Sequence, residues 1–268
     1  MKLTITSKDN SQIKYLRKLI FSSKFRKEEK KFVIEGLRIC DEALKNNLKI
    51  KKVFYTEKFY EKNLDLINQI SKVASEIILI SESIAKSISD TENPQGIIAV
   101  CENTINSFDN LNLDNTQKTV LLENIQNPSN LGSIIRTCDA LNIKNIFILG
   151  NSCDIYNPKV LRGSMGGFFR VSFIFEENSE KCIRKLQESG FKIYATVPDK
   201  NASHIGKINF TGKCGIVFGN EGNGMSKGSI EACDDKITIP MNSDSESLNV
   251  SVAAGISMWE MCGRGKEL

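Results

Sequence analysis

Short, almost purely apolar runs recur through the second half of the chain, and they restrict the fold more than any other feature of the sequence. The runs are Val120–Leu122, Ile146–Leu149, Phe191–Tyr194, Ile216–Phe218 and Ile237–Ile239. Such runs are typical of strands that are covered on both faces, as in a parallel sheet. They therefore predict an α/β domain with a parallel sheet in this half.

Helical patterns lie between most of these runs. One stretch has Leu131, Ile134, Ile135, Cys138 and Leu141 on one face. Another runs from Ser179 to Ser189 and stops at Gly190, a residue that favours the end of a helix.

The first hundred residues also alternate between helical and strand patterns. Ile13, Leu16 and Ile20 indicate a basic amphipathic helix, and a second helix face carries Leu37, Cys40 and Leu44. The expected strands are Phe32–Ile34, Val53–Tyr55, Ile77–Ile80 and Ile97–Val100. The stretch 103–117 is rich in Asn, Asp, Ser and Thr and is predicted as a linker. We therefore expect a small α/β domain over 1–102, a linker over 103–117 and a second domain over 118–268.

The charge distribution indicates a polyanionic partner. Residues 1–60 carry 16 Lys or Arg against 7 Asp or Glu, whereas the whole chain has a net charge of only +4. A basic part of this kind suits a surface that binds a polyanion, although a lysine-rich solvated surface explains the same count.

Several classes of protein are disfavoured. No segment has the roughly 18 consecutive apolar residues that a membrane helix needs, and the polar N-terminus does not resemble a signal peptide. The 8 Cys are scattered with no CxxC pair, so we expect reduced thiols, a cytoplasmic location and no metal site.

Three loops that follow expected strands carry the polar residues, and ligands bind beyond the carboxyl ends of strands in open α/β sheets. The first loop, 127–136, contains a helix start, which Ser129 or Asn130 can cap, and ends at Arg136. These features suit an anion site, or an ordinary capped helix with a surface arginine.

The second and third loops are glycine-rich and polar. Residues 219–226 have the spacing G-x-x-G-x-G, which is neither the dinucleotide fingerprint G-x-G-x-x-G nor a P-loop, so a dinucleotide oxidoreductase is disfavoured. Residues 239–255 form a polar loop before a helix with Leu248, Val252, Ile256 and Trp259 on one side. Ser247 or Asn249 is expected to cap this helix or to contact a ligand.

Together the three loops resemble the SpoU (TrmH) family of RNA ribose 2′-O-methyltransferases, within the SPOUT class. The resemblance covers 118–268 and includes the stretch Asn157–Gly166. Around Phe32–Gly36 the N-terminal part resembles, more loosely, the family's substrate-binding domain, which is similar to ribosomal protein L30e. The resemblance implies a deep trefoil knot in the second domain, a feature too rare for composition to suggest.

The resemblance also implies the cofactor and the site residues. S-adenosylmethionine is expected to bind Gly219, Ile239, Met241, Leu248 and Val250, largely through backbone groups. Catalytic positions are Arg136, Asn130, Glu221, Ser247 and Asn249. Ser243, which stands where relatives usually have Gly, and the charged Asp244 put cofactor affinity in doubt.

The family's arginine, sometimes named a general base, corresponds to Arg136. A guanidinium stays charged, with a pKa above about 12, so we expect a clamp on the RNA phosphate and the developing alkoxide instead. The only histidine, His204, lies outside the motifs, which disfavours a histidine mechanism.

The partners follow from the same resemblance. We expect a homodimer, with the terminal helix around Met258, Trp259 and Met261 as a candidate contact surface or as plain core. The expected substrate is structured RNA, with 23S ribosomal RNA ahead of tRNA. A non-catalytic RNA-binding protein is the alternative, which the intact motifs disfavour.

Overall fold

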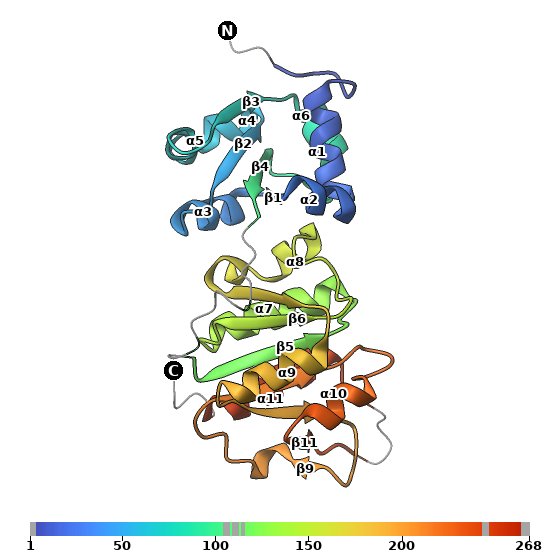
Figure 1. Ribbon diagram of the computed structural model, residues 1–268. Coiled ribbons are helices and arrows are strands. Elements are labelled where there is room, and N and C mark those ends of the chain that lie inside the picture. The colour runs from blue at the N-terminus through green and yellow to red at the C-terminus, as the bar shows by residue number, and fades with distance from the viewer. Residues whose placement is uncertain (1–3, 104–107, 109–112, 114–115, 243–246, 264–268) are drawn as a thin grey trace. The chain divides into compact units, whose positions relative to one another are not determined.

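The computed structural model describes residues 4–103, 108, 113, 116–242 and 247–263, and it divides into two compact units (Figure 1). The first unit comprises residues 1–104 and 156–169, and the second comprises 105–155 and 170–268. The segment 156–169 therefore belongs to the first unit although it lies within the C-terminal half of the sequence. Most of the predicted linker, together with Ser243 and Asp244, lies outside the described residues.

The first unit is built on a mixed four-stranded sheet in the order β1-β4-β2-β3. Its strands are β1 (Lys31–Glu35), β2 (Ile50–Tyr55), β3 (Glu76–Leu79) and β4 (Ile97–Glu102). β4 runs antiparallel to both of its neighbours, and β2 pairs with β3 in parallel. All four strands expected in this part are confirmed.

Helices surround this sheet and complete its core. They are α1 (Ser11–Phe21), α2 (Ser23–Glu29), α3 (Leu37–Lys45), α4 (Glu57–Lys62), α5 (Leu64–Ser71), α6 (Glu82–Ile88) and α8 (Pro158–Gly163). Ile13, Leu16 and Ile20 of α1 are buried in the core cluster, which confirms the amphipathic helix. The segment that carries α8 is anchored by aromatic contacts, because the Phe32 ring lies 4.5 Å from Tyr156 and 5.9 Å from Phe168.

The second unit contains a fully parallel seven-stranded sheet in the order β7-β6-β5-β10-β8-β11-β9. The strands are β5 (Lys118–Glu123), β6 (Asn145–Leu149), β7 (Ser172–Glu176), β8 (Lys192–Thr196), β9 (Ser203–His204), β10 (Cys214–Phe218) and β11 (Asp235–Thr238). The parallel sheet predicted from the apolar runs is confirmed. β7 and β9 were not expected: β7 has only three apolar residues between the polar Ser172 and Glu176, and β9 has only two residues.

Helices cover both faces of this sheet (Figure 1). α9 (Ser179–Glu188) packs with α10 (Lys227–Ala232), and α7 (Pro128–Ala140) packs with α11 (Val250–Met261). Cys182, Ile183 and Leu186 of α9 share a buried cluster with alternate residues of the central strands. The two predicted helices correspond to α7 and α9, and Gly190 has the positive φ of +87° expected after a helix.

No disulfide joins any of the 8 Cys, all of which are among the described residues. No helix among the described residues is long and apolar enough to cross a membrane.

Candidate active site

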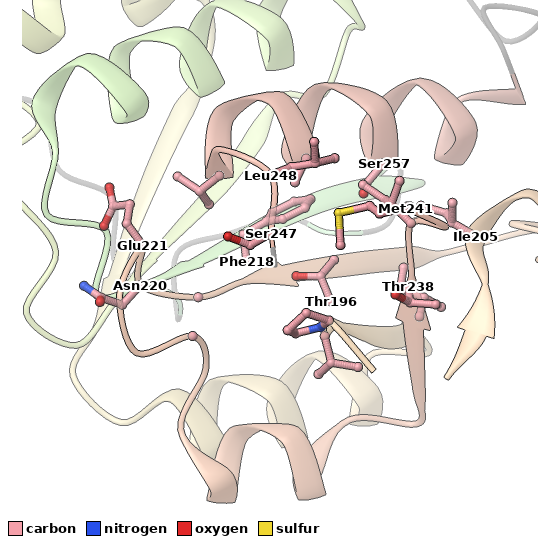
Figure 2. Close-up of a pocket in the computed structure, with 18 of the residues that line it drawn as sticks. Thr196, Ile205, Phe218, Asn220, Glu221, Thr238, Met241, Ser247, Leu248 and Ser257 are labelled. Carbon is pink, nitrogen blue, oxygen red and sulfur yellow. The ribbon is translucent and has the colours of Figure 1, made fainter. Parts of the chain in front are cut away.

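A pocket opens at the carboxyl ends of β8, β10 and β11, where the sheet of the second unit meets α11 (Figure 2). Its lining comes from the residues after each of these strands and from the start and middle of α11. The lining residues are Thr196, Val197, Pro198, Ile205, Phe218, Gly219, Asn220, Glu221, Gly222, Gly224, Ile237, Thr238, Ile239, Met241, Ser247, Leu248, Val250, Ala253 and Ser257. Residues of the second and third predicted loops thus line a pocket at the strand ends, where ligands bind in open α/β sheets.

Hydrogen bonds join the three predicted loops to one another beside this pocket. Asn130 Nδ2 donates to Glu221 Oε1 at 3.0 Å, and Asn249 Nδ2 donates to Asn130 Oδ1 at 3.1 Å. One residue from each loop thus belongs to a single chain of contacts. Asn130 is buried at its centre, with 7% of its surface exposed.

The Glu221 carboxylate also accepts hydrogen bonds from the loop that leads into α7. Its two oxygens accept the backbone N–H groups of Gln126 and Asn127 at 3.2 and 3.1 Å. Burial raises the pKa of the Glu221 carboxyl, but the hydrogen bonds from Asn130 and from backbone N–H groups outweigh it. The pKa therefore lies below its usual range, and Glu221 is a carboxylate at neutral pH.

The glycine-rich loop is shaped by its own backbone. Asn220 and Gly224 exchange two backbone hydrogen bonds of 2.9 Å, and Gly224 has a φ of +67°. A Cβ on Gly219 would lie 2.3 Å from backbone atoms of Gly224 and Met225. Gly219 is therefore required by the close approach of the loop to itself, a reason that the spacing alone did not give.

One of the two helix caps differs from the expectation and the other confirms it. Asn127 caps α7 by accepting the Ser129 N–H at 2.8 Å, whereas Ser129 or Asn130 was expected. Pro128 explains this, because it occupies the first helical position, where a missing N–H costs nothing. At α11 the cap is Asn249, one of the two expected residues, and it accepts the Ser251 N–H at 2.9 Å.

The predicted site residues fall into three groups. All five predicted cofactor residues, Gly219, Ile239, Met241, Leu248 and Val250, line the pocket, as do Glu221 and Ser247. Asn130 and Asn249 are linked to it through Glu221. Arg136 lies on the exposed side of α7, and no described residue forms a salt bridge with it.

The terminal helix differs from the expected contact surface in a specific way. Met258 and Met261 have no exposed surface and belong to the core of the second unit, where Met258 Sδ lies 3.4 Å from Cys138 Sγ. Trp259, in contrast, is 46% exposed. Of the two alternatives left open for this helix, a contact surface or plain core, both methionines therefore belong to the core.

Comparisons with known proteins match two separate parts of the chain. Residues 117–259 match the SpoU rRNA Methylase family, and residues 10–99 match an MRM3-like substrate binding domain. The first match alone spans more than half of the chain. The chain belongs to the SpoU rRNA methylase family. The predicted family is thus confirmed, and with it the predicted class of activity, S-adenosylmethionine-dependent 2′-O-methylation of RNA.

Relatives of this SpoU-family chain are similar over different lengths. A 23S rRNA (guanosine(2553)-2′-O)-methyltransferase of Bacillus subtilis is 29% identical over 97% of this chain and 99% of its own. The structure of an AdoMet-bound rRNA methyltransferase from Sinorhizobium meliloti is 25% identical, with a TM-score of 0.88 and 98% of each chain covered. A TrmH/SpoU tRNA modifying enzyme of A. aeolicus is 30% identical, with a TM-score of 0.51, over 57% of this chain and 77% of its own.

Sequence reasoning missed several lining residues of this SpoU-family pocket. Thr196 ends β8 and Val197 and Pro198 follow it, so the rule used for the other two loops would have found them. Ile205 and Ser257 carried no comparable signal, because Ile205 lies in a short 3₁₀ turn and Ser257 lies inside a helix.

Proposed function

We propose that this chain methylates a ribose 2′-hydroxyl of 23S ribosomal RNA. The observation that carries the proposal is the Asn130–Glu221–Asn249 network beside the pocket, which unites all three family motifs. The choice of ribosomal RNA is supported by similarity over the full chain, since the 23S rRNA relative covers 97% of it. The tRNA-modifying relative covers only 57% of it.

The chemistry of the pocket fits S-adenosylmethionine. Among the described lining residues, Glu221 is the only charged one, and the others offer apolar surface, backbone groups and a few hydroxyls. A neutral base and a ribose suit such walls. Gly219, Ile239, Met241, Leu248 and Val250 would hold the cofactor, which supplies a methyl group activated by its sulfonium.

The residues of this chain then have to position the ribose and promote loss of its proton. We assign Arg136 to the RNA phosphate and the developing alkoxide, because its guanidinium stays charged and is exposed to solvent. Glu221 and Asn130 fix the end of the loop that leads into α7, the helix that carries Arg136. Ser247 lines the pocket, and we assign it to the substrate ribose.

The finer fold belongs to the same proposal. The C-terminal loops form a deep trefoil knot, which is supported by the strand order, since β10 lies between β5 and β8 although both precede it in sequence. The first unit serves as an L30e-like RNA-binding domain, which is supported by its match to a substrate binding domain and by the basic excess in residues 1–60. We keep 1–102, 103–117 and 118–268 as the functional division of the whole chain into substrate-binding domain, linker and methyltransferase domain.

The protein acts as a homodimer in this proposal. α11 exposes an apolar stripe at helical spacing, with Val252 50%, Ile256 39% and Trp259 46% exposed, and Leu248 extends it at 37%. A stripe of this kind on a helix is typical of a contact surface. A second copy of the chain is its expected occupant, because a self-complementary apolar face favours a twofold interface.

Mapping of ribose methylation in total RNA tests the proposed substrate. Cells with and without the gene are compared, and one 2′-O-methyl signal in 23S rRNA is expected to disappear and to return with the parent gene. An Arg136→Ala gene should not restore it. Loss of a signal in tRNA, with 23S rRNA unchanged, would overturn the ribosomal assignment.

A further inference from the structure

One buried hydroxyl in the second unit has no partner. Ser257, in the middle of α11, has no exposed surface, and its Oγ forms no hydrogen bond with any described residue. A serine inside a helix ordinarily bonds the carbonyl one turn earlier when it is buried. Ser257 does not, so its hydroxyl is directed away from its own helix backbone.

Other buried hydroxyls of the chain show that this is exceptional. Ser164 Oγ donates to the Leu161 carbonyl at 2.8 Å, Ser229 Oγ donates to Glu123 at 2.7 Å, and Thr119 Oγ1 donates to the Asn145 carbonyl at 2.9 Å. Buried polar groups are nearly always paired, because an unpaired one loses its hydration without compensation. The Ser257 hydroxyl therefore needs a partner that the described residues do not provide.

The position of Ser257 indicates where that partner comes from. Ser257 lines the pocket described above. In the view of Figure 2, Ser257, Met241, Thr238 and Ile205 lie at one end, and Asn220 and Glu221 lie at the other. The only charged residue of the described lining, Glu221, is thus far from Ser257.

The residues at the Ser257 end of the pocket fit one part of S-adenosylmethionine better than the other. The methionine part of S-adenosylmethionine carries an ammonium and a carboxylate, which favour charged or strongly polar partners. Adenine is neutral and flat, and its ring nitrogens and amino group can accept from or donate to a single hydroxyl. Apolar walls with one unpaired hydroxyl fit the base.

We propose that the Ser257 hydroxyl forms a hydrogen bond with the adenine of S-adenosylmethionine, which makes Ser257 a cofactor-binding residue of this chain. The inference rests on the proposed cofactor pocket. Ser257 is fully buried and Met241 lies near it in Figure 2, so in this proposal the base reaches the hydroxyl through a change of rotamer of the flexible Met241 side chain.

Calorimetric binding of S-adenosylhomocysteine, a product that cannot react, tests the inference on the full chain. Ser257→Ala is expected to weaken binding about three- to tenfold, the range for loss of one neutral hydrogen bond. Without ligand, the same variant should be at least as stable to urea as the parent, because it removes an unpaired buried polar group.

Ser164→Ala is the matched control. It removes a buried hydroxyl that is paired and lies outside the pocket, so it should lower stability and leave the affinity unchanged. Binding of adenosine, which lacks the methionine part, should weaken in Ser257→Ala by the same factor as binding of S-adenosylhomocysteine.

Three outcomes separate the possibilities. Equal affinity of parent and Ser257→Ala would overturn the inference. Weakened S-adenosylhomocysteine binding with unchanged adenosine binding would overturn the assignment to the base. A parent chain that binds neither ligand would instead contradict the proposed function.

Discussion

Asn130 and Glu221 are 91 positions apart in sequence, yet Asn130 Nδ2 donates a 3.0 Å hydrogen bond to Glu221 Oε1. Through this contact the helix start after β5 is fixed to the loop after β10. Asn249 adds the start of α11, because its own amide donates to Asn130. The residues that the motifs contributed separately therefore act as one structural unit.

Asn130→Ala removes the donor to Glu221 and the acceptor of Asn249 at once. We expect the free energy of unfolding in urea to fall by about 1–2 kcal/mol, since a buried amide that bonds a carboxylate is lost. Methyl transfer should fall further than stability. Ser133→Ala, an exposed change on the same helix, is the control and should alter neither. An Asn130→Ala chain with parental activity would contradict a role for the network.

The lowered pKa of Glu221 predicts how the stability of the fold changes at acid pH. Its pKa is lower in the folded state than the usual value of about 4.3, so its carboxylate stabilises the fold above that pH. This contribution is lost as the pH falls through the lowered pKa. Urea unfolding of the parent and of Glu221→Gln between about pH 6 and pH 3 measures it. The stability difference between the two should shrink towards the acid end, and a constant difference would argue against the lowered pKa.

The sheet of the second unit was predictable because its central strands contain uninterrupted apolar runs, whereas β7, with only Phe173, Ile174 and Phe175 between two polar ends, was missed. The loops were predictable because strand order in a parallel sheet brings carboxyl ends together. The hydrogen-bond network between the loops was not predictable. No local sequence pattern indicates that Asn130 bonds both Glu221 and Asn249.

The stripe on α11 shows a second limit. Leu248, Val252, Ile256 and Trp259 form an apolar face by spacing, which ordinarily indicates core. In the structure this face is exposed, and the opposite side, with Ala254, Ser257, Met258 and Met261, is buried. A helix that is apolar on both sides gives no periodic signal to decide which side is core. For the same reason, no sequence pattern indicated that Ser257, inside such a helix, lines a pocket.

Arg136→Lys and Arg136→Ala test the clamp. Removal of a group that stabilises developing charge typically lowers kcat about 100- to 1000-fold, so we expect this loss in the alanine variant. The lysine variant keeps the charge but not the two-pronged geometry and should remain at least tenfold below the parent. Single-turnover methylation of RNA gives the rates. S-adenosylhomocysteine binding should be unchanged, because Arg136 does not line the pocket. Nearly full turnover by Arg136→Lys would show that no bidentate clamp operates.

The cysteines are predicted to be unreactive in the native state. Burial raises the pKa of Cys153 and of Cys233 to about 12, and burial likewise raises the pKa of the Cys182 thiol to about 12. At pH 8 only about one molecule in ten thousand then carries a thiolate at each position, and the thiolate is the reactive form. Mass spectrometry after treatment with iodoacetamide should find these positions unmodified in the native protein and modified in urea. Rapid native labelling of Cys153 would contradict the raised pKa.

Val252→Glu tests the proposed dimer. Val252 is half exposed on the apolar stripe of α11, so a carboxylate there leaves the isolated unit's core intact but places charge in the proposed interface. We expect the parent to have the mass of a dimer in light scattering after size exclusion, and Val252→Glu to have that of a monomer. Val73→Glu changes a residue of similar exposure (53%) in the first unit and should remain dimeric. Circular dichroism checks that both variants are folded. A parent that is monomeric at micromolar concentration, or a Val252→Glu chain that stays dimeric, would show that the stripe has another occupant.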